Sequence, residues 1–195
     1  LNASANSWGP RNQEAYLRRY GLFEAQIVVL LLNTDDLFAT APTSLPVGRD
    51  RNYPAYRPPL ALIEIFSRFF GTPQPIQEMA EVRKEKGDRV GLNLAAIAKI
   101  QDMAKQANAQ FLLAMSPLLR EVEASPREYE QKARQRLQQF TGEQHIPYVD
   151  FLAKFKQFER PETLYRDHIH LTPQGNQFVS ETLSHSILGM GNGEF

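Results

Sequence analysis

Two continuous apolar runs constrain the fold of this chain more than any other feature. Residues 27–32 read Ile-Val-Val-Leu-Leu-Leu, and residues 111–115 read Phe-Leu-Leu-Ala-Met before Ser116-Pro117. Runs of this length without polar alternation are typical of strands buried on both faces, as in a parallel sheet covered by helices. Residues 146–149 form a weaker third strand candidate.

Helical patterns separate these runs. Residues 11–20 precede the first run, and apolar side chains recur at steps of three and four in residues 94–107, before the second. Residues 126–141 predict a charged helix with Ser125 as its N-cap, and a last helix starts at Thr172. The alternation of helix and apolar strand predicts an α/β sandwich with a parallel sheet.

A long excursion interrupts this alternation. Residues 38–90 lie between the first two strands and predict an insertion into a single domain that spans residues 1–195. It begins with a proline-rich stretch, continues as an apolar helix over residues 60–70, and ends in a charge run at residues 78–89. Excursions of this kind carry binding sites in α/β folds.

Composition narrows the class of partner. The chain holds 22 basic and 22 acidic residues, so no net charge favours nucleic acid, and a small-molecule substrate is expected. Its longest apolar run is too short to span a bilayer. There is no cysteine, which excludes disulfide and thiolate chemistry but fits either the cytoplasm or the periplasm. Compartment and oligomeric state stay open.

The chemistry of the chain concentrates near its C-terminus, in residues 165–176. Asp167 and His170 are three residues apart in a predicted loop before the last helix. At this spacing the carboxylate can hold one imidazole nitrogen while the other faces a hydroxyl group. We expect the pair to be hydrogen-bonded at the carboxyl edge of the sheet, where α/β folds place their sites, beside Asp35.

This block resembles the last conserved block of the SGNH (GDSL-type) serine hydrolases, in which Asp-x-x-His supplies two members of a Ser-His-Asp triad. The resemblance implies a flavodoxin-like three-layer α/β/α fold, with Asp167 and His170 as catalytic residues. It also implies a carboxylic-ester hydrolase, esterase- or lipase-like, that acts on a small acyl ester or an acylated carbohydrate. Such chemistry needs no cofactor and no metal.

The residues after the first strand are similar to the family's Gly-x-Asn-Asp block. In the run Asn33-Thr-Asp-Asp, Asn33 takes the Gly place, Asp35 the place of the oxyanion-hole asparagine, and Asp36 the place of the supporting aspartate. An ionised Asp35 has no proton to donate to an oxyanion. The hole therefore requires a protonated Asp35, the Asn33 amide, or backbone N–H groups. A simple strand-end turn is the alternative interpretation.

The N-terminal stretch, residues 2–10, resembles the family's glycine-containing turn, whose backbone N–H contributes to the oxyanion hole. Ser7 falls near the usual glycine, and Gly9 follows two residues later. Serine can lend its backbone N–H as glycine does. An ordinary polar loop before a helix is the alternative.

The family's nucleophile, the serine of a Gly-Asp-Ser motif, is absent from these 195 residues. Ser7 and Ser116 do not stand in a nucleophile motif. In the family, this serine follows a central strand that precedes the turn block. Loss of that strand exposes two unpaired sheet edges. We therefore expect that a natural segment upstream of Leu1 supplies the missing strand and serine, and that this chain alone is inactive.

Two other functions compete with this interpretation. A non-catalytic SGNH-like module that binds a ligand or polymer fits the changes at Ser7 and Asp35. A metal-dependent phosphoesterase is the other, with ligands drawn from Asp35, Asp36, Asp167, His168 and His170. The phosphoesterase lacks the usual ligand spacing.

Overall fold

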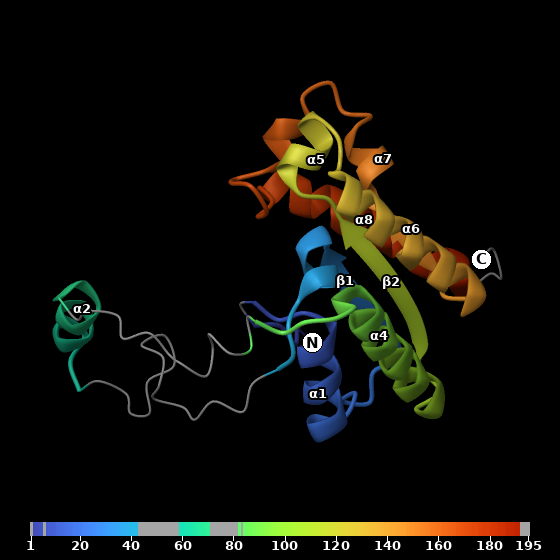
Figure 1. Ribbon diagram of the computed structural model, residues 1–195, viewed down its shortest axis with the longest axis horizontal. Coiled ribbons are helices and arrows are strands. Elements are labelled where there is room, and N and C mark those ends of the chain that lie inside the picture. The colour runs from blue at the N-terminus through green and yellow to red at the C-terminus, as the bar shows by residue number, and fades with distance from the viewer. Residues whose placement is uncertain (1, 6, 43–58, 71–81, 83, 192–195) are drawn as a thin grey trace. The chain divides into compact units, whose positions relative to one another are not determined.

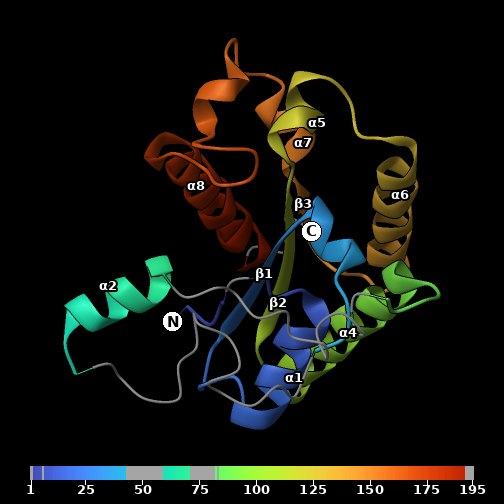
Figure 2. The same cartoon turned by 60° about the vertical axis from the view of Figure 1, so that its left-hand side comes forward.

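The apolar runs form the strands of a parallel sheet, as predicted. The strands are β1 (Ile27–Asn33), β2 (Gln110–Ser116) and β3 (Tyr148–Asp150), paired in the order β1-β2-β3. Figure 1 labels β1 and β2, and Figure 2 also labels β3. All pairs are parallel, with Asn33 opposite Ser116 and Met115 opposite Asp150. The carboxyl ends of the three strands therefore lie at one edge of the sheet. The third strand begins two residues later than the predicted run, after Pro147, which has no N–H for the ladder.

The computed structural model describes residues 2–5, 7–42, 59–70, 82 and 84–191, without the side chains of residues 67–70. The chain divides into two units, Leu1–Ala39 with Asp88–Phe195, and Thr40–Gly87. Most of the predicted insertion, including the proline-rich stretch and much of the charge run, lies outside the described residues. A single domain with an insertion over residues 38–90 stays a prediction.

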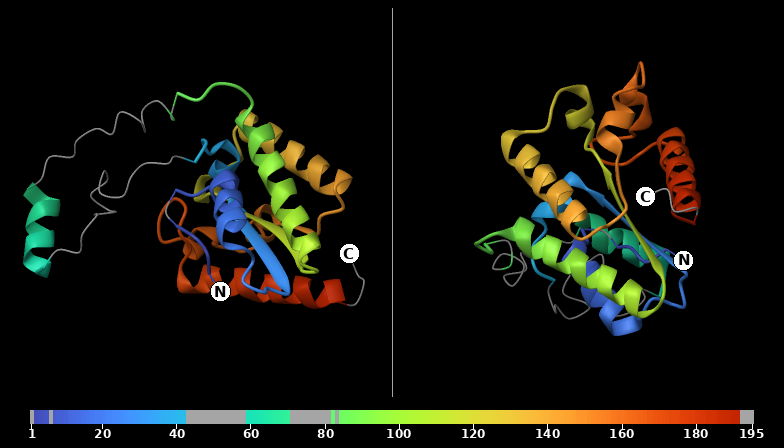
Figure 3. Two further views of the ribbon diagram at one scale, coloured as in Figure 1. Left: turned by 90° about the horizontal axis from the view of Figure 1, so that it is seen from below. Right: turned by 90° about the vertical axis from the view of Figure 1, so that its right-hand side faces the viewer.

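Helices cover both faces of the sheet in the larger unit. They are α1 (Pro10–Tyr20), α4 (Arg89–Gln106), α5 (Leu119–Glu123), α6 (Glu128–Glu143), α7 (Phe151–Phe155) and α8 (Pro173–Gly191), with the 3-10 helices η1 (Thr34–Phe38) and η2 (Pro161–Leu164). Figure 2 shows α8 apart from α1 and α4, and Figure 3 shows the strands lying between them. The predicted α/β class with a covered parallel sheet is confirmed.

Each face of the sheet has its own hydrophobic core. On one face, Leu30, Leu32 and Leu113 pack against α4 and α6, with Ile97 and Leu137 fully buried. On the other, Leu112, Ala114 and Val149 pack against Phe151, Phe155 and Val179. The two cores make the three-layer arrangement, because successive strand residues point to opposite faces.

The helical periodicity of residues 94–107 is confirmed by α4. Leu94, Ile97, Ile100 and Ala104 are all buried on one side of it. Asp88 caps this helix by accepting the N–H of Gly91 at 2.9 Å. One face of α8, which carries Val179, Leu183 and Ile187, likewise packs into the second core.

The predicted start of the charged helix is wrong. Ser125 is not the N-cap of α6, which begins at Glu128 after Arg127. Glu130 accepts the N–H of Arg127 at 2.7 Å and also pairs with Arg120. A buried carboxylate that satisfies a backbone N–H and an arginine together moves the helix start past Ser125.

The prediction that the first strand is buried on both faces is also wrong in part. Leu30 and Leu32 are buried, but Val29 and Leu31 are 38% and 43% exposed. Within the described residues, α7 and α8 pack against β2 and β3 on that face, whereas β1 is an edge strand. An apolar run alone does not distinguish these two positions.

In the smaller unit, the apolar helix predicted at residues 60–70 is confirmed as α2 (Ala61–Phe70). Leu60, Leu62 and Ile63 on and beside it are exposed. Across the described part of the chain, no helix is both long and apolar enough to cross a membrane.

Candidate catalytic site

The loop between η2 and α8 brings Asp167 and His170 together, with the hydrogen bond that their spacing predicts. His170 Nδ1 lies 2.8 Å from Asp167 Oδ2 and 3.0 Å from Oδ1. The same carboxylate accepts the backbone N–H groups of Ile169 at 3.0 Å and His170 at 2.8 Å. Asp167 therefore fixes both the loop backbone and the imidazole ring.

These donors also set the charge of Asp167. The backbone N–H groups of His170 and Ile169, followed by the imidazole of His170, hold the pKa of Asp167 well below its usual range. An ionised Asp167 accepts Nδ1–H of the ring, which leaves Nε2 as the proton acceptor. The His170 side chain is 63% exposed, so a substrate can reach it. This is the arrangement of a general base and its orienting carboxylate.

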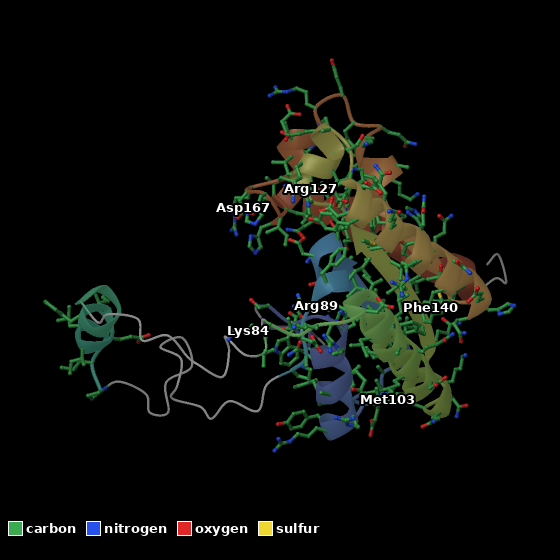
Figure 4. All side chains as sticks on the ribbon, in the orientation of Figure 1. Lys84, Arg89, Met103, Arg127, Phe140 and Asp167 are labelled. Atoms are coloured by element: carbon green, nitrogen blue, oxygen red, sulfur yellow. The ribbon has the colours of Figure 1, made fainter. Side chains whose placement is uncertain are left out.

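Two hydrogen bonds attach this loop to the end of β2. Leu119, in α5, donates its N–H to the carbonyl oxygen of His168 at 3.1 Å. The buried Tyr165 donates its hydroxyl to the carbonyl oxygen of Pro117, the residue after β2, at 2.7 Å. The acid–histidine pair therefore lies at the carboxyl edge of the sheet, and Figure 4 shows Asp167 at this end of the molecule.

The start of α8 holds the loop from the other side. Tyr165 and Leu171 form an antiparallel bridge that closes the loop at its base. Gly175, in the first turn of α8, lies so close to η2 that a Cβ atom there would be 2.3 Å from the carbonyl oxygen of Leu164. Only a residue without a side chain permits this approach. The backbone around His170 is therefore fixed at both ends.

The loop after β1 carries the predicted oxyanion-hole residues. Asn33 is the N-cap of η1: its Oδ1 accepts the N–H of Asp35 at 2.9 Å, and Asp36 Oδ2 accepts the N–H of Asn33 at 2.8 Å. The amide nitrogen of Asn33 carries two N–H donors, and the Asn33 side chain also interacts with the Asp36 carboxyl group. The Asp35 side chain is exposed. Of these two residues, only Asn33 carries side-chain N–H donors.

Asp36 supports this loop from a largely buried position. Burial raises the pKa of Asp36 to about 6, against the opposing effect of the Asn33 N–H, and the charge of Asp35 adds to the rise. The carboxyl group therefore changes charge close to neutral pH while it holds the backbone of the loop after β1.

This raised pKa predicts that the stability of the folded protein depends on pH. Because the folded state holds the Asp36 proton up to pH of about 6 and the unfolded state loses it near 3.8, stability falls as pH rises between these values. Asp36→Asn removes this loss but keeps an acceptor for Asn33 N–H. We expect the variant to gain up to about 3 kcal/mol over the wild type between pH 4 and pH 7.5. Urea denaturation of both proteins at pH 4 and at pH 7.5 measures the free energy of unfolding. An equal change of this free energy with pH in the two proteins would contradict the prediction.

The N-terminal turn lies against the same loop. Ser7 has a φ of 62°, in the left-handed region that favours glycine. A Cβ atom at Gly9 would lie 2.2 Å from Cβ of Ala39, just after η1. The N–H of Gly9 faces Asn12 Oδ1 at 3.4 Å, within the cap of α1. Ser7 is therefore better suited than Gly9 to lend a backbone N–H to a ligand.

The structure joins the predicted residues into two groups. Asp167 and His170 form one, and the turn at Ser7 and Gly9 lies against the Asn33–Asp36 loop to form the other. Within the described ranges, no three His, Asp or Glu side chains gather as metal ligands. The predicted catalytic and oxyanion-hole roles stay predictions.

Sequence reasoning missed the side chains that lie beneath this edge. Thr34, Glu121 and Arg134 form buried polar contacts there. Glu121 and Arg134 come from charged helical stretches, in which nothing distinguishes a buried charge from a solvated one. Thr34 occupies the variable position of its motif, so its identity carried no signal.

Comparison with known proteins agrees with this architecture. Residues 1–178 match the family described as the GDSL-like Lipase/Acylhydrolase family. The match includes the turn at Ser7, the loop after β1 and the Asp167–His170 pair. No curated protein matches the chain.

Proposed function

Because the chain belongs to the GDSL-like lipase/acylhydrolase family, we propose that it supplies the acid–base pair and the oxyanion hole of a serine carboxylic-ester hydrolase. The family gives the general activity, that of a hydrolase. The hydrogen bond between Asp167 and His170 carries the finer proposal, because it aligns a carboxylate with an imidazole whose Nε2 is left as a base.

The reaction proceeds through an acyl-enzyme. Serine Oγ bonds to the ester carbonyl carbon while its proton passes to His170 Nε2. The same proton then leaves with the alkoxide, as the carbon–oxygen bond to the alcohol breaks. Water attacks the acyl-enzyme, gives its proton to Nε2, and releases the acid as that proton returns to Oγ. Asp167 keeps the imidazole in one tautomer throughout.

The nucleophile of this proposal is a serine outside residues 1–195. No serine of the chain stands in a Gly-Asp-Ser sequence. Ser116, at the end of β2, is buried. Ser7 lies in the turn assigned to the oxyanion hole, where its backbone rather than its hydroxyl is needed.

The oxyanion hole combines side-chain and backbone donors. The Asn33 side-chain amide provides an N–H group in addition to its contact with Asp36, and the N–H of Ser7 provides another. Donors fixed before the reaction begins stabilise the tetrahedral oxyanion without reorganisation. The exposed position of His170 suits a small acyl ester or an acylated carbohydrate as substrate.

A second function is favoured by Asp35. Its exposed carboxylate stands where the family has an oxyanion-hole asparagine, and negative charge there opposes formation of an oxyanion. A protein that uses this edge to bind a ligand without hydrolysis meets no such conflict.

Hydrolysis of p-nitrophenyl acetate separates these functions. We expect residues 1–195 alone to hydrolyse the ester no faster than denatured protein, and the natural full-length protein to turn over. A fluorophosphonate probe should label one serine of the full-length protein, outside these residues. Turnover by residues 1–195 that Ser7→Ala abolishes would instead place the nucleophile at Ser7. A full-length protein that neither turns over nor reacts with the probe would favour the binding function.

A further inference from the structure

A buried ionic network lies beneath the candidate site and belongs to neither of its two groups. Thr34 and Glu121 are fully buried, and Arg134 is only 8% exposed. They come from η1, α5 and α6, which are far apart in the sequence, and Asp150 at the end of β3 completes the set.

The contacts of this network are specific. Glu121 Oε2 accepts the hydroxyl of Thr34 at 2.6 Å and the backbone N–H of Leu118 at 2.7 Å. Arg134 Nη1 donates to Thr34 Oγ1 at 2.9 Å and lies 3.6 Å from Glu121 Oε1. Arg134 Nη2 pairs with Asp150, whose Oδ1 also caps α7 by accepting Leu152 N–H. The Thr34 hydroxyl therefore both donates and accepts, which fixes its orientation.

Burial of these charges is not explained by stability alone. The desolvation of a buried ion pair commonly cancels its attraction, and well-packed apolar side chains serve equally well. Apolar side chains cannot form directional hydrogen bonds that join one element to another. The network provides directional bonds to four different elements, η1, α5, α6 and the end of β3.

Those elements carry the two halves of the candidate site. Thr34 stands between Asn33 and Asp35, so its side chain anchors the oxyanion loop from below. Glu121 belongs to α5, whose Leu119 N–H holds the carbonyl of His168, two residues before His170. One buried carboxylate therefore lies between the oxyanion loop and the loop of the general base.

We propose that Thr34, Glu121 and Arg134 are positioning residues, which hold the Asn33 loop and the His170 loop in one fixed geometry. The expected effect on rate rests on the esterase function proposed above. The coupling between the two loops does not depend on that function. A displacement of about 1 Å between a base and an oxyanion hole lowers rates by about 10²-fold, so loss of one anchor has a kinetic signature.

The kinetic test uses Thr34→Val, an isosteric change, in the full-length protein. We expect kcat for p-nitrophenyl acetate to fall at least about tenfold with KM within about twofold. Thr34→Ser, which keeps the hydroxyl, should restore most of kcat. The matched control is Thr141→Val: Thr141 is also buried, but its hydroxyl only donates to Gln138 within α6. It should lower thermal stability without lowering kcat.

A second measurement does not need activity. In NMR spectra of the isotopically labelled full-length protein, Thr34→Val should shift the imidazole signals of His170 as well as the amide signals of Asn33, and Thr141→Val should shift neither. Arg134→Lys keeps the positive charge but cannot reach both Thr34 and Asp150, so it should cause the same signal shifts as Thr34→Val. It replaces Thr34→Val in this test if that variant does not fold. If these NMR signals shift but neither the wild type nor any variant hydrolyses the ester, the esterase function is overturned and the coupling between the two loops still stands. Unmoved His170 signals, or equal kcat losses at Thr34 and Thr141, would overturn the positioning role.

Discussion

His170→Ala is expected to lower kcat/KM of the full-length protein for p-nitrophenyl acetate by at least about 10³-fold. The imidazole takes the serine proton in the proposed mechanism, and loss of a triad base costs several orders of magnitude. The alanine variant also loses the ring contact to Asp167, but the carboxylate keeps two backbone N–H donors that hold the loop. Steady-state kinetics, with circular dichroism to verify folding, measures the effect.

The loop provides its own control. His168 lies two residues away, and its side chain is 81% exposed with Nδ1 4.0 Å from Asp167, beyond hydrogen-bonding distance. His168→Ala keeps the carbonyl oxygen that Leu119 binds. We expect it to retain activity within about twofold, well inside the effect of losing a triad member. Equal losses of activity in the two variants would show that activity depends on the structure of the loop and not on His170 as a base. Unchanged activity in His170→Ala would contradict the proposed triad.

The two long strands of the sheet were predictable because each contains a continuous apolar run. Both long runs became parallel strands, and the period of α4 identified its buried side from the spacing of Leu94, Ile97 and Ile100. What the runs did not reveal is position within the sheet. Val29 and Leu31 are as apolar as Leu112 and Ala114 but are exposed, because strand order depends on long-range packing that local sequence does not encode.

Local polar chemistry was predictable only where its partners are close in sequence. The pairing of Asp167 with His170 joins residues three apart, and it is present. Thr34, Glu121 and Arg134 contact one another across separations of 87 and 100 residues. The start of α6 was predicted wrongly for the same reason, because it depends on the pairing of Glu130 with Arg120 of another helix.

The geometry of the loop after β1 favours one of the oxyanion-hole donors that its sequence left open. Three donors were open: a protonated Asp35, the Asn33 amide, or the backbone. Asp35 is exposed and its N–H is taken by Asn33 Oδ1. The Asn33 amide carries two N–H donors, although its side chain also interacts with the Asp36 carboxyl group. The proposed esterase therefore depends on a residue in the place of the family's glycine, while the charge of the aspartate at the usual position opposes the oxyanion.

Asn33→Ala is accordingly expected to lower kcat by about 10²-fold, the usual cost of losing one oxyanion-hole donor. This variant also removes the cap of η1, so the decisive variant is Asn33→Asp. Its carboxylate still accepts the N–H of Asp35 and preserves the cap, but it has no N–H donor and places negative charge where the oxyanion forms. We expect it to lose at least as much kcat as Asn33→Ala while losing less thermal stability.

The complementary change is Asp35→Asn, which restores the family's donor and removes a charge. We expect kcat to rise or stay constant, since an amide at this position can only assist the oxyanion. Full activity in Asn33→Asp would assign the oxyanion hole to backbone N–H groups such as that of Ser7. A steep loss in Asp35→Asn would mean that the carboxylate itself takes part, because removal of a charge that opposes the oxyanion cannot lower the rate by this mechanism. That result would exclude the oxyanion mechanism proposed for this loop and require a reaction in which Asp35 acts as a base or a ligand.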